Sequence, residues 1–109
     1  VLRFCQEHGG DRKQSISMSL AAEEICMNIL RYGFRAGGDY SMDVKVMKTE
    51  TGWKMRIRDN CDAFDPVHYL ENYNPADEAA HIGIKMVNSL AKSISYTYTL
   101  KINNLLIEI

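Results

Sequence analysis

Apolar residues recur at helical spacing in three stretches of the chain. In the clearest, residues 17–34, every third or fourth residue is apolar, and glycines follow the stretch. Residues 1–8 show a shorter pattern that ends at Gly9-Gly10, where glycine commonly caps a helix. Residues 82–93 show the same spacing again. The pattern therefore predicts three helices.

Alternation of apolar and polar residues indicates strands at four further places. The first two strands are expected over residues 42–49 and 53–59, joined by a Glu-Thr-Gly turn. Two more are expected over residues 94–101 and 105–109, with the Asn-Asn pair at residues 103–104 as the turn between them. All four strands follow the longest predicted helix in the sequence.

The second predicted strand indicates which face of the sheet is buried. Trp53, Met55, Ile57 and Asp59 share one face, and basic residues alternate with them on the other face. A sheet with one apolar and one charged face is covered by helices on one side only. The sequence therefore predicts an α+β fold, a two-layer α/β sandwich with helices on one face of a mainly antiparallel, mixed sheet.

Residues 61–80 contain Pro66 and Pro75 and show no sustained period, which predicts a long loop. Loops of this length in compact domains are often functional. Gly83 is expected where this loop meets the following helix. The unpaired amides and the positive dipole end of such a helix start would suit an anion such as phosphate, although a single glycine there is more often a simple turn.

Length, charge and cysteine content narrow the class of protein. At 109 residues the chain suits one domain, residues 1–109. Its net charge of −1 and the absence of a basic stripe argue against nucleic acid as a partner. Three isolated cysteines fit a cytoplasmic location or the cytosolic face of a membrane protein, and no apolar run reaches the ~20 residues of a membrane span. Because the sequence begins with Val1, we expect a fragment of a longer protein.

Three polar residues are candidates for a functional site. Glu24 and Asn28 are four residues apart, so they stack on one edge of the predicted helix, at the border of its apolar arc. Such a pair is more often an ordinary solvated edge. Asp59 lies on the buried strand face, where its carboxylate needs a partner. That partner is either an amine such as the exocyclic amino group of adenine, or backbone amides at the strand end.

Three segments, in this order, resemble the motifs of the GHKL ATPases, which are histidine kinase-like ATPase domains. Residues 20–29, LAAEEICMNI, resemble the N box. Residues 59–66, DNCDAFDP, resemble the first glycine box, and residues 81–87, HIGIKMV, resemble the second. The resemblance covers the chain from about residue 17 onward and is nearest to the anti-sigma-factor serine kinases.

The resemblance implies that ATP and Mg²⁺ are bound. Glu24 would be the catalytic general base, Asn28 would coordinate Mg²⁺, and Asp59 would bind the adenine amino group. Residues 67–80 would form the lid. Asn28 and Asp59 are therefore expected to converge on one cavity of nucleotide size. The other ATP-binding residues that the resemblance implies are Cys61, Ala63, Phe64, Ile82, Gly83, Ile84 and Lys85.

Three residues depart from the family pattern. Cys61, Ala63 and His81 stand where GHKL proteins usually or often have glycine. A side chain at these positions restricts the backbone and crowds a nucleotide. We therefore expect ATP binding that is weak or altered in geometry.

The resemblance to anti-sigma-factor kinases implies an ATP-dependent protein serine/threonine kinase in bacterial regulatory signalling. Such a protein holds a partner, such as a sigma factor, phosphorylates an antagonist protein, and commonly forms homodimers. Two alternatives stay open. The chain is either an ATP-sensing cytosolic C-terminal module of a larger protein, without kinase activity, or a nucleotide-free interaction domain that keeps the fold.

Overall fold

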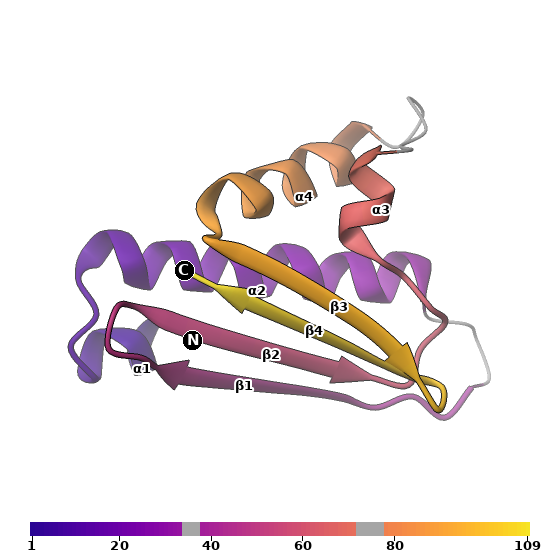
Figure 1. Cartoon of the computed structure of the whole chain (residues 1–109), viewed down its shortest axis with the longest axis horizontal. Coiled ribbons are helices and arrows are strands. Elements are labelled where there is room, and N and C mark those ends of the chain that lie inside the picture. Colours follow the sequence, from indigo (N-terminus) through magenta and orange to yellow (C-terminus); the bar gives the residue numbers. More distant parts are fainter. Residues whose placement is uncertain (34–37, 72–77) are drawn as a thin grey trace.

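Helices cover one face of a four-stranded sheet in a two-layer arrangement (Figure 1). The computed structural model describes residues 1–33, 38–71 and 78–109. Its elements, in chain order, are α1 (Leu2–Glu7), α2 (Arg12–Tyr32), β1 (Met42–Lys48), β2 (Trp53–Asp59), α3 (Pro66–Glu71), α4 (Glu78–Leu90), β3 (Ser93–Thr99) and β4 (Ile102–Glu108).

The strands follow the order β1-β2-β4-β3, and every neighbouring pair is antiparallel. This arrangement confirms the predicted α+β sandwich, and the strands of the described ranges contain no parallel pair. The last strand in the sequence, β4, lies in the interior of the sheet beside β2. Its register places Asn103 directly opposite Asp59. Directly opposed residues in an antiparallel pair share a face, so both side chains point toward the helices.

Helix α2 runs along the sheet and carries most of the helical side of the core. It begins at Arg12, before the predicted start, because Asp11 and Gln14 form a capping box that apolar periodicity does not reveal. Asp11 Oδ1 accepts a hydrogen bond from the Gln14 amide at 2.7 Å. The helix ends at Tyr32 with Gly33 as its C-cap, and the predicted end at residue 34 lies outside the described residues. None of the described helices combines the length and apolar character needed to cross a bilayer.

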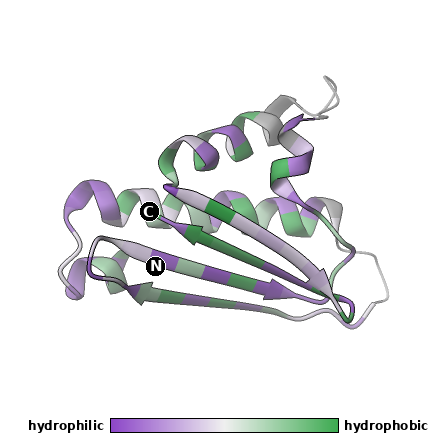
Figure 2. Ribbon diagram, viewed as in Figure 1, coloured by the Kyte–Doolittle hydropathy of each residue, from purple (hydrophilic) through white to green (hydrophobic). Residues whose placement is uncertain are grey.

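The core forms between α2 and the helix-facing side of β2 and β4. Strand β2 alternates buried and more exposed residues along its length, and Figure 2 shows the alternation as bands. Its buried face was predicted correctly, including the burial of Asp59 at the end of the strand. The central core residues on both sides are Met18, Ala21, Ile25, Ile29, Trp53, Met55, Ile57, Leu105 and Ile107.

The hairpin between β3 and β4 turns earlier than predicted. Leu100 and Lys101 have φ values of 52° and 61°, the conformation that a two-residue type I′ turn requires. The expected turn at residues 103–104 is wrong, because both asparagines lie within β4. Asparagine is a strong turn signal in sequence, but Asn103 is only 4% exposed, and its amide is fully used inside the protein.

The expected long loop over residues 61–80 is also wrong over part of its length, since it contains α3 and the beginning of α4. Asp65 caps α3 by accepting hydrogen bonds from the amides of Val67, at 2.9 Å, and His68, at 3.3 Å. Pro66 occupies the first helical position, where its missing amide is no loss. Residues 72–77, the middle of the predicted lid, lie outside the described residues.

Candidate functional site

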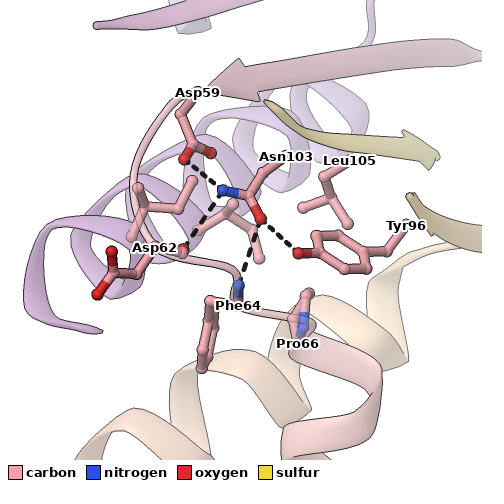
Figure 3. Close-up of a pocket in the computed structure, with 9 residues that line it drawn as sticks. Asp59, Asp62, Phe64, Pro66, Tyr96, Asn103 and Leu105 are labelled. Carbon is pink, nitrogen blue, oxygen red and sulfur yellow. Dashed lines mark hydrogen bonds between the residues drawn. The ribbon is translucent and has the colours of Figure 1, made fainter. Parts of the chain in front are cut away.

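Asp59 is the last residue of β2 and is 4% exposed on the helix-facing side of the sheet. Its Oδ1 accepts hydrogen bonds from the Cys61 amide at 3.0 Å and from Asn103 Nδ2 at 2.9 Å. Partners of this kind are what a buried carboxylate requires. Asp59 therefore caps the end of its own strand, as one of the two sequence interpretations proposed, and both N–H donors act on the same oxygen. Figure 3 shows the bond from Asn103.

Asn103 is the main residue of this site that sequence reasoning missed. Its Nδ2 donates to Asp59 Oδ1 and to the carbonyl oxygens of Cys61, at 3.0 Å, and Asp62, at 3.3 Å. Its Oδ1 accepts from the Phe64 amide at 3.3 Å and from the Tyr96 hydroxyl. The side chain thus joins β4, β3 and the segment after β2 (Figure 3). The signal that could have found it is a polar residue at an inward position of an otherwise apolar strand.

A cavity beside Asp59, which we call the Asp59 cavity, is enclosed mainly by apolar side chains (Figure 3). Its volume is about 10 Å³, which is room for about one water molecule. The expected nucleotide-sized cavity shared by Asn28 and Asp59 is therefore wrong for this conformation, and Asn28 is not part of the lining. The lining residues are Ile25, Ile29, Asp59, Asp62, Phe64, Pro66, Tyr96, Asn103 and Leu105.

Asn28 lies one turn after Glu24 on α2 and is 2% exposed. Its Nδ2 donates to the Glu24 carbonyl oxygen at 2.7 Å, whereas its Oδ1 is buried without a hydrogen bond. Buried polar atoms normally have a partner, and a carbonyl oxygen suits a hard cation such as Mg²⁺. The residues of the described ranges form no cluster of three or more acidic, histidine or cysteine ligands, so a cation here would need further oxygen ligands from a bound molecule.

The Glu24 carboxylate lies against Gly83 of α4. A Cβ atom placed on Gly83 would be 2.0 Å from Glu24 Oε2, so only glycine leaves this carboxylate where it is. The contact brings the first and third predicted motifs together in space, although nearly sixty residues separate them in the sequence.

Gly83 does not open its helix, contrary to expectation. Helix α4 begins at Glu78, because Glu78, Ala79 and Ala80 favour helix and extend it in the N-terminal direction. Gly83 therefore lies within the helix, and its amide is not part of a free helix start. Of its neighbours, Ile84 is 1% exposed in the core, while Ile82 and Lys85 are exposed on the surface.

The three positions where the sequence lacks an expected glycine, Cys61, Ala63 and His81, differ in environment. Cys61 is buried, and a Cβ on Gly33 would lie 2.8 Å from Cys61 Cβ. Burial, followed by the neighbouring Asp59 carboxylate, raises the pKa of the Cys61 thiol. Ala63 is exposed, whereas Phe64 lines the Asp59 cavity. The side chain of His81 lies outside the described residues.

Comparisons with known proteins agree with the fold described above. Residues 1–108 match the family model of the histidine kinase-like ATPase domain. The histidine kinase domain from Erythrobacter litoralis EL346 blue-light activated histidine kinase has a similar fold, with a TM-score of 0.66 at 13% identity over 88% of this chain. This chain spans 47% of the length of that one. No curated protein matches the sequence. The chain belongs to the family of histidine kinase-like ATPase domains.

Proposed function

We propose that the domain binds ATP, with its adenine ring at the Asp59 cavity. The observation that carries the proposal is a buried carboxylate with both of its N–H donors on one oxygen, at the edge of a cavity lined by apolar side chains. An apolar wall with a few placed polar groups is typical of small-molecule sites. The second oxygen of Asp59 is the acceptor for the adenine amino group.

A nucleotide requires the Asp59 cavity to widen, because its present volume is about 10 Å³. Phe64 and Pro66 line it from the segment that leads into α3. Binding therefore involves an outward shift of this wall, while Ile25 and Ile29 on α2 and Leu105 on β4 stay in the core. The closed cavity also gives support to a second candidate, a nucleotide-free interaction domain.

Mg²⁺ is the cation we propose for Asn28. The buried Oδ1 without a hydrogen bond supports this assignment, and the phosphates of ATP would supply the further oxygens. When bound, Mg²⁺ neutralises charge on the phosphates. Glu24, one turn away on the same helix, orients a hydroxyl or water for phosphoryl transfer.

For the activity, we propose a serine/threonine kinase of the anti-sigma-factor type, which holds a regulatory protein partner as a homodimer and phosphorylates an antagonist. The Phe64-Asp65-Pro66 ending of the second motif supports this branch. An ATP sensor without phosphoryl transfer is the alternative. Radiolabelled ATP with candidate antagonist proteins separates the two, because only the kinase labels a protein.

Asp59→Asn should weaken ATP binding about thirtyfold, or roughly 2 kcal/mol. The Asn oxygen can keep the hydrogen bonds from Cys61 and Asn103, but its amide nitrogen then replaces the second acceptor oxygen and faces the adenine amine, donor against donor. Calorimetric titration with ATP and Mg²⁺ measures the change. The control is Asp43→Asn, whose side chain is 70% exposed in a surface ion pair with Arg56. Equal affinities of the two variants would reject the assignment, and no binding by the unmodified protein would favour the interaction domain.

Gly83→Ala should leave the fold intact while impairing turnover. Alanine favours a helix interior by about 1 kcal/mol over glycine, and the atom it meets is the mobile end of the Glu24 side chain. The Glu24 carboxylate must therefore move away, and we expect turnover of ATP to fall about tenfold or more. Urea unfolding and a phosphate-release assay measure the two effects. Full turnover with unchanged stability would show that the position of this carboxylate is unimportant.

A further inference from the structure

Asn103 fixes how many oxygens Asp59 can offer to a ligand. The two residues are directly opposed on β4 and β2, and both are 4% exposed. The Asn103 carboxamide takes part in five hydrogen bonds, three through Nδ2 and two through Oδ1. Exchanging its nitrogen and oxygen would place Nδ2 against the Phe64 amide, which can only donate. It would also place Oδ1 against three acceptor oxygens, so the network allows one orientation only. Nδ2 must therefore point at Asp59.

Among the described residues, N–H groups donate to Asp59 Oδ1 and none donates to the other oxygen, which is therefore the one available to an N–H donor of a ligand. Oδ1 accepts from both Asn103 Nδ2 and the Cys61 amide, which fills its two lone pairs. A ligand can thus add an N–H donor only to the other oxygen. The usual bidentate pairing of a carboxylate with two parallel donors is blocked by a residue of the protein itself.

We infer that Asn103 is a specificity-determining positioning residue that makes Asp59 a one-oxygen acceptor and so selects adenine nucleotides over purine nucleotides with two adjacent donors. The inference rests on the proposed ATP binding. Adenine presents one donor, its 6-amino group, beside the acceptor N1. Its recognition therefore needs one carboxylate oxygen. Guanine presents N1–H and a 2-amino group side by side, and isoguanine presents a 6-amino group and N1–H side by side. Both require a carboxylate with two free oxygens for their best pairing.

The test compares three nucleotides and three proteins by calorimetric titration with Mg²⁺. The nucleotides are ATP, GTP and isoguanosine triphosphate, which keeps the 6-amino group of adenine and adds the adjacent N1–H donor. The unmodified protein should bind ATP at least as tightly as isoguanosine triphosphate and at least tenfold more tightly than GTP. Tenfold tighter binding of isoguanosine triphosphate than of ATP would overturn the inference without any variant.

Asn103→Ala frees one of the two acceptor positions of Asp59 Oδ1, while the Cys61 amide keeps the other. The change also leaves space for water to reach the Cys61 and Asp62 carbonyl oxygens. We expect the affinity for isoguanosine triphosphate, relative to ATP, to rise about tenfold, the effect of one additional charge-assisted hydrogen bond. Tyr96→Phe is the matched control, because it removes a partner of Asn103 Oδ1 but keeps the bond from Nδ2 to Asp59. Its affinity ratio should stay within about twofold of that of the unmodified protein.

A purely structural role for Asn103 predicts a different result. A loosened cavity lowers the affinity for all three nucleotides together and leaves the ratios of these affinities unchanged. That outcome in a folded Asn103→Ala protein overturns the inference. An equal change of ratio in Tyr96→Phe overturns it as well. If circular dichroism shows that Asn103→Ala is unfolded, the affinities of the unmodified protein for the three nucleotides test the inference. Absence of ATP binding by the unmodified protein overturns the proposed function instead, whereas ATP binding with the wrong ratios overturns only the role of Asn103.

Discussion

Glu24→Gln should leave the affinity for ATP and Mg²⁺ within about twofold and reduce turnover of ATP about a hundredfold or more. The substitution keeps the shape of a side chain that lies against Gly83 but removes its ability to accept a proton. The backbone oxygen of Glu24, which holds Asn28 Nδ2 at 2.7 Å, is unaffected, so the proposed Mg²⁺ ligand stays in place. Calorimetry gives the affinity, and phosphate release or transfer to a protein gives the turnover.

Glu23→Gln is the matched control, because Glu23 precedes Glu24 on the same helix and is exposed. It should change neither affinity nor turnover. Equal turnover of the two variants would remove Glu24 as general base. Absence of turnover in the unmodified protein, together with normal ATP binding, would leave the ATP sensor as the function.

Trp53→Ala should destabilise the fold by about 3 to 5 kcal/mol, a large part of the stability of a typical small domain. Trp53 is 2% exposed at the start of β2 and is the largest fully buried side chain in the described ranges. Its ring packs edge to face with Phe4 of α1, with centroids 6.1 Å apart, and lies beside Gly10. Its removal leaves a cavity between the short first helix and the sheet. Urea denaturation monitored by circular dichroism measures the loss.

The adjacent substitution Lys54→Ala provides the comparison. Lys54 points to the opposite face of β2 and pairs with Glu108 at 2.9 Å, with both side chains 38% exposed. Exposed ion pairs contribute less than about 1 kcal/mol. A loss of stability for Trp53→Ala as small as that for Lys54→Ala would mean that the region between α1 and the sheet is not well packed.

The parts of the fold that sequence predicted are those in which burial follows a simple period. Strand β2 alternates between the core and water, so its inward face could be assigned, including Asp59. The middle of α2 buries one stripe, with Ile25 and Ile29 against the sheet, and gave a clear helical pattern. Family membership also followed from sequence, because the three motifs are local and keep their order.

The parts that sequence missed depend on contacts or caps without such a period. The first turn of α2 is polar and is held by the Asp11 capping box, and α3 is a short helix started by Asp65 and Pro66. The turn at Leu100 adopts positive φ without the glycine or asparagine that usually marks it. Such features are decided by backbone hydrogen bonds and by tertiary packing, which override local residue preference.

The candidate site shows the same division. Asn28 and Glu24 were correctly placed on one edge of a helix, but the unpaired Asn28 Oδ1 and the contact of Glu24 with Gly83 needed the packing of α2 against α4. The role of Asn103 was hidden because an Asn-Asn pair is typical of turns. Its inward position follows only from the register of β4 against β2.

The pairing of Asp59 with Asn103 also has a consequence for biosynthesis. The two residues are 44 positions apart, and the strand that carries Asn103 is the last of the four to leave the ribosome, although it occupies an interior position in the sheet. When α2 and β2 have emerged from the ribosome, the nascent chain still lacks the Asn103 carboxamide, which holds the Asp59 carboxylate and the segment after it. The proposed adenine acceptor is therefore held in place only after β4 has been synthesised and inserts between its two neighbours.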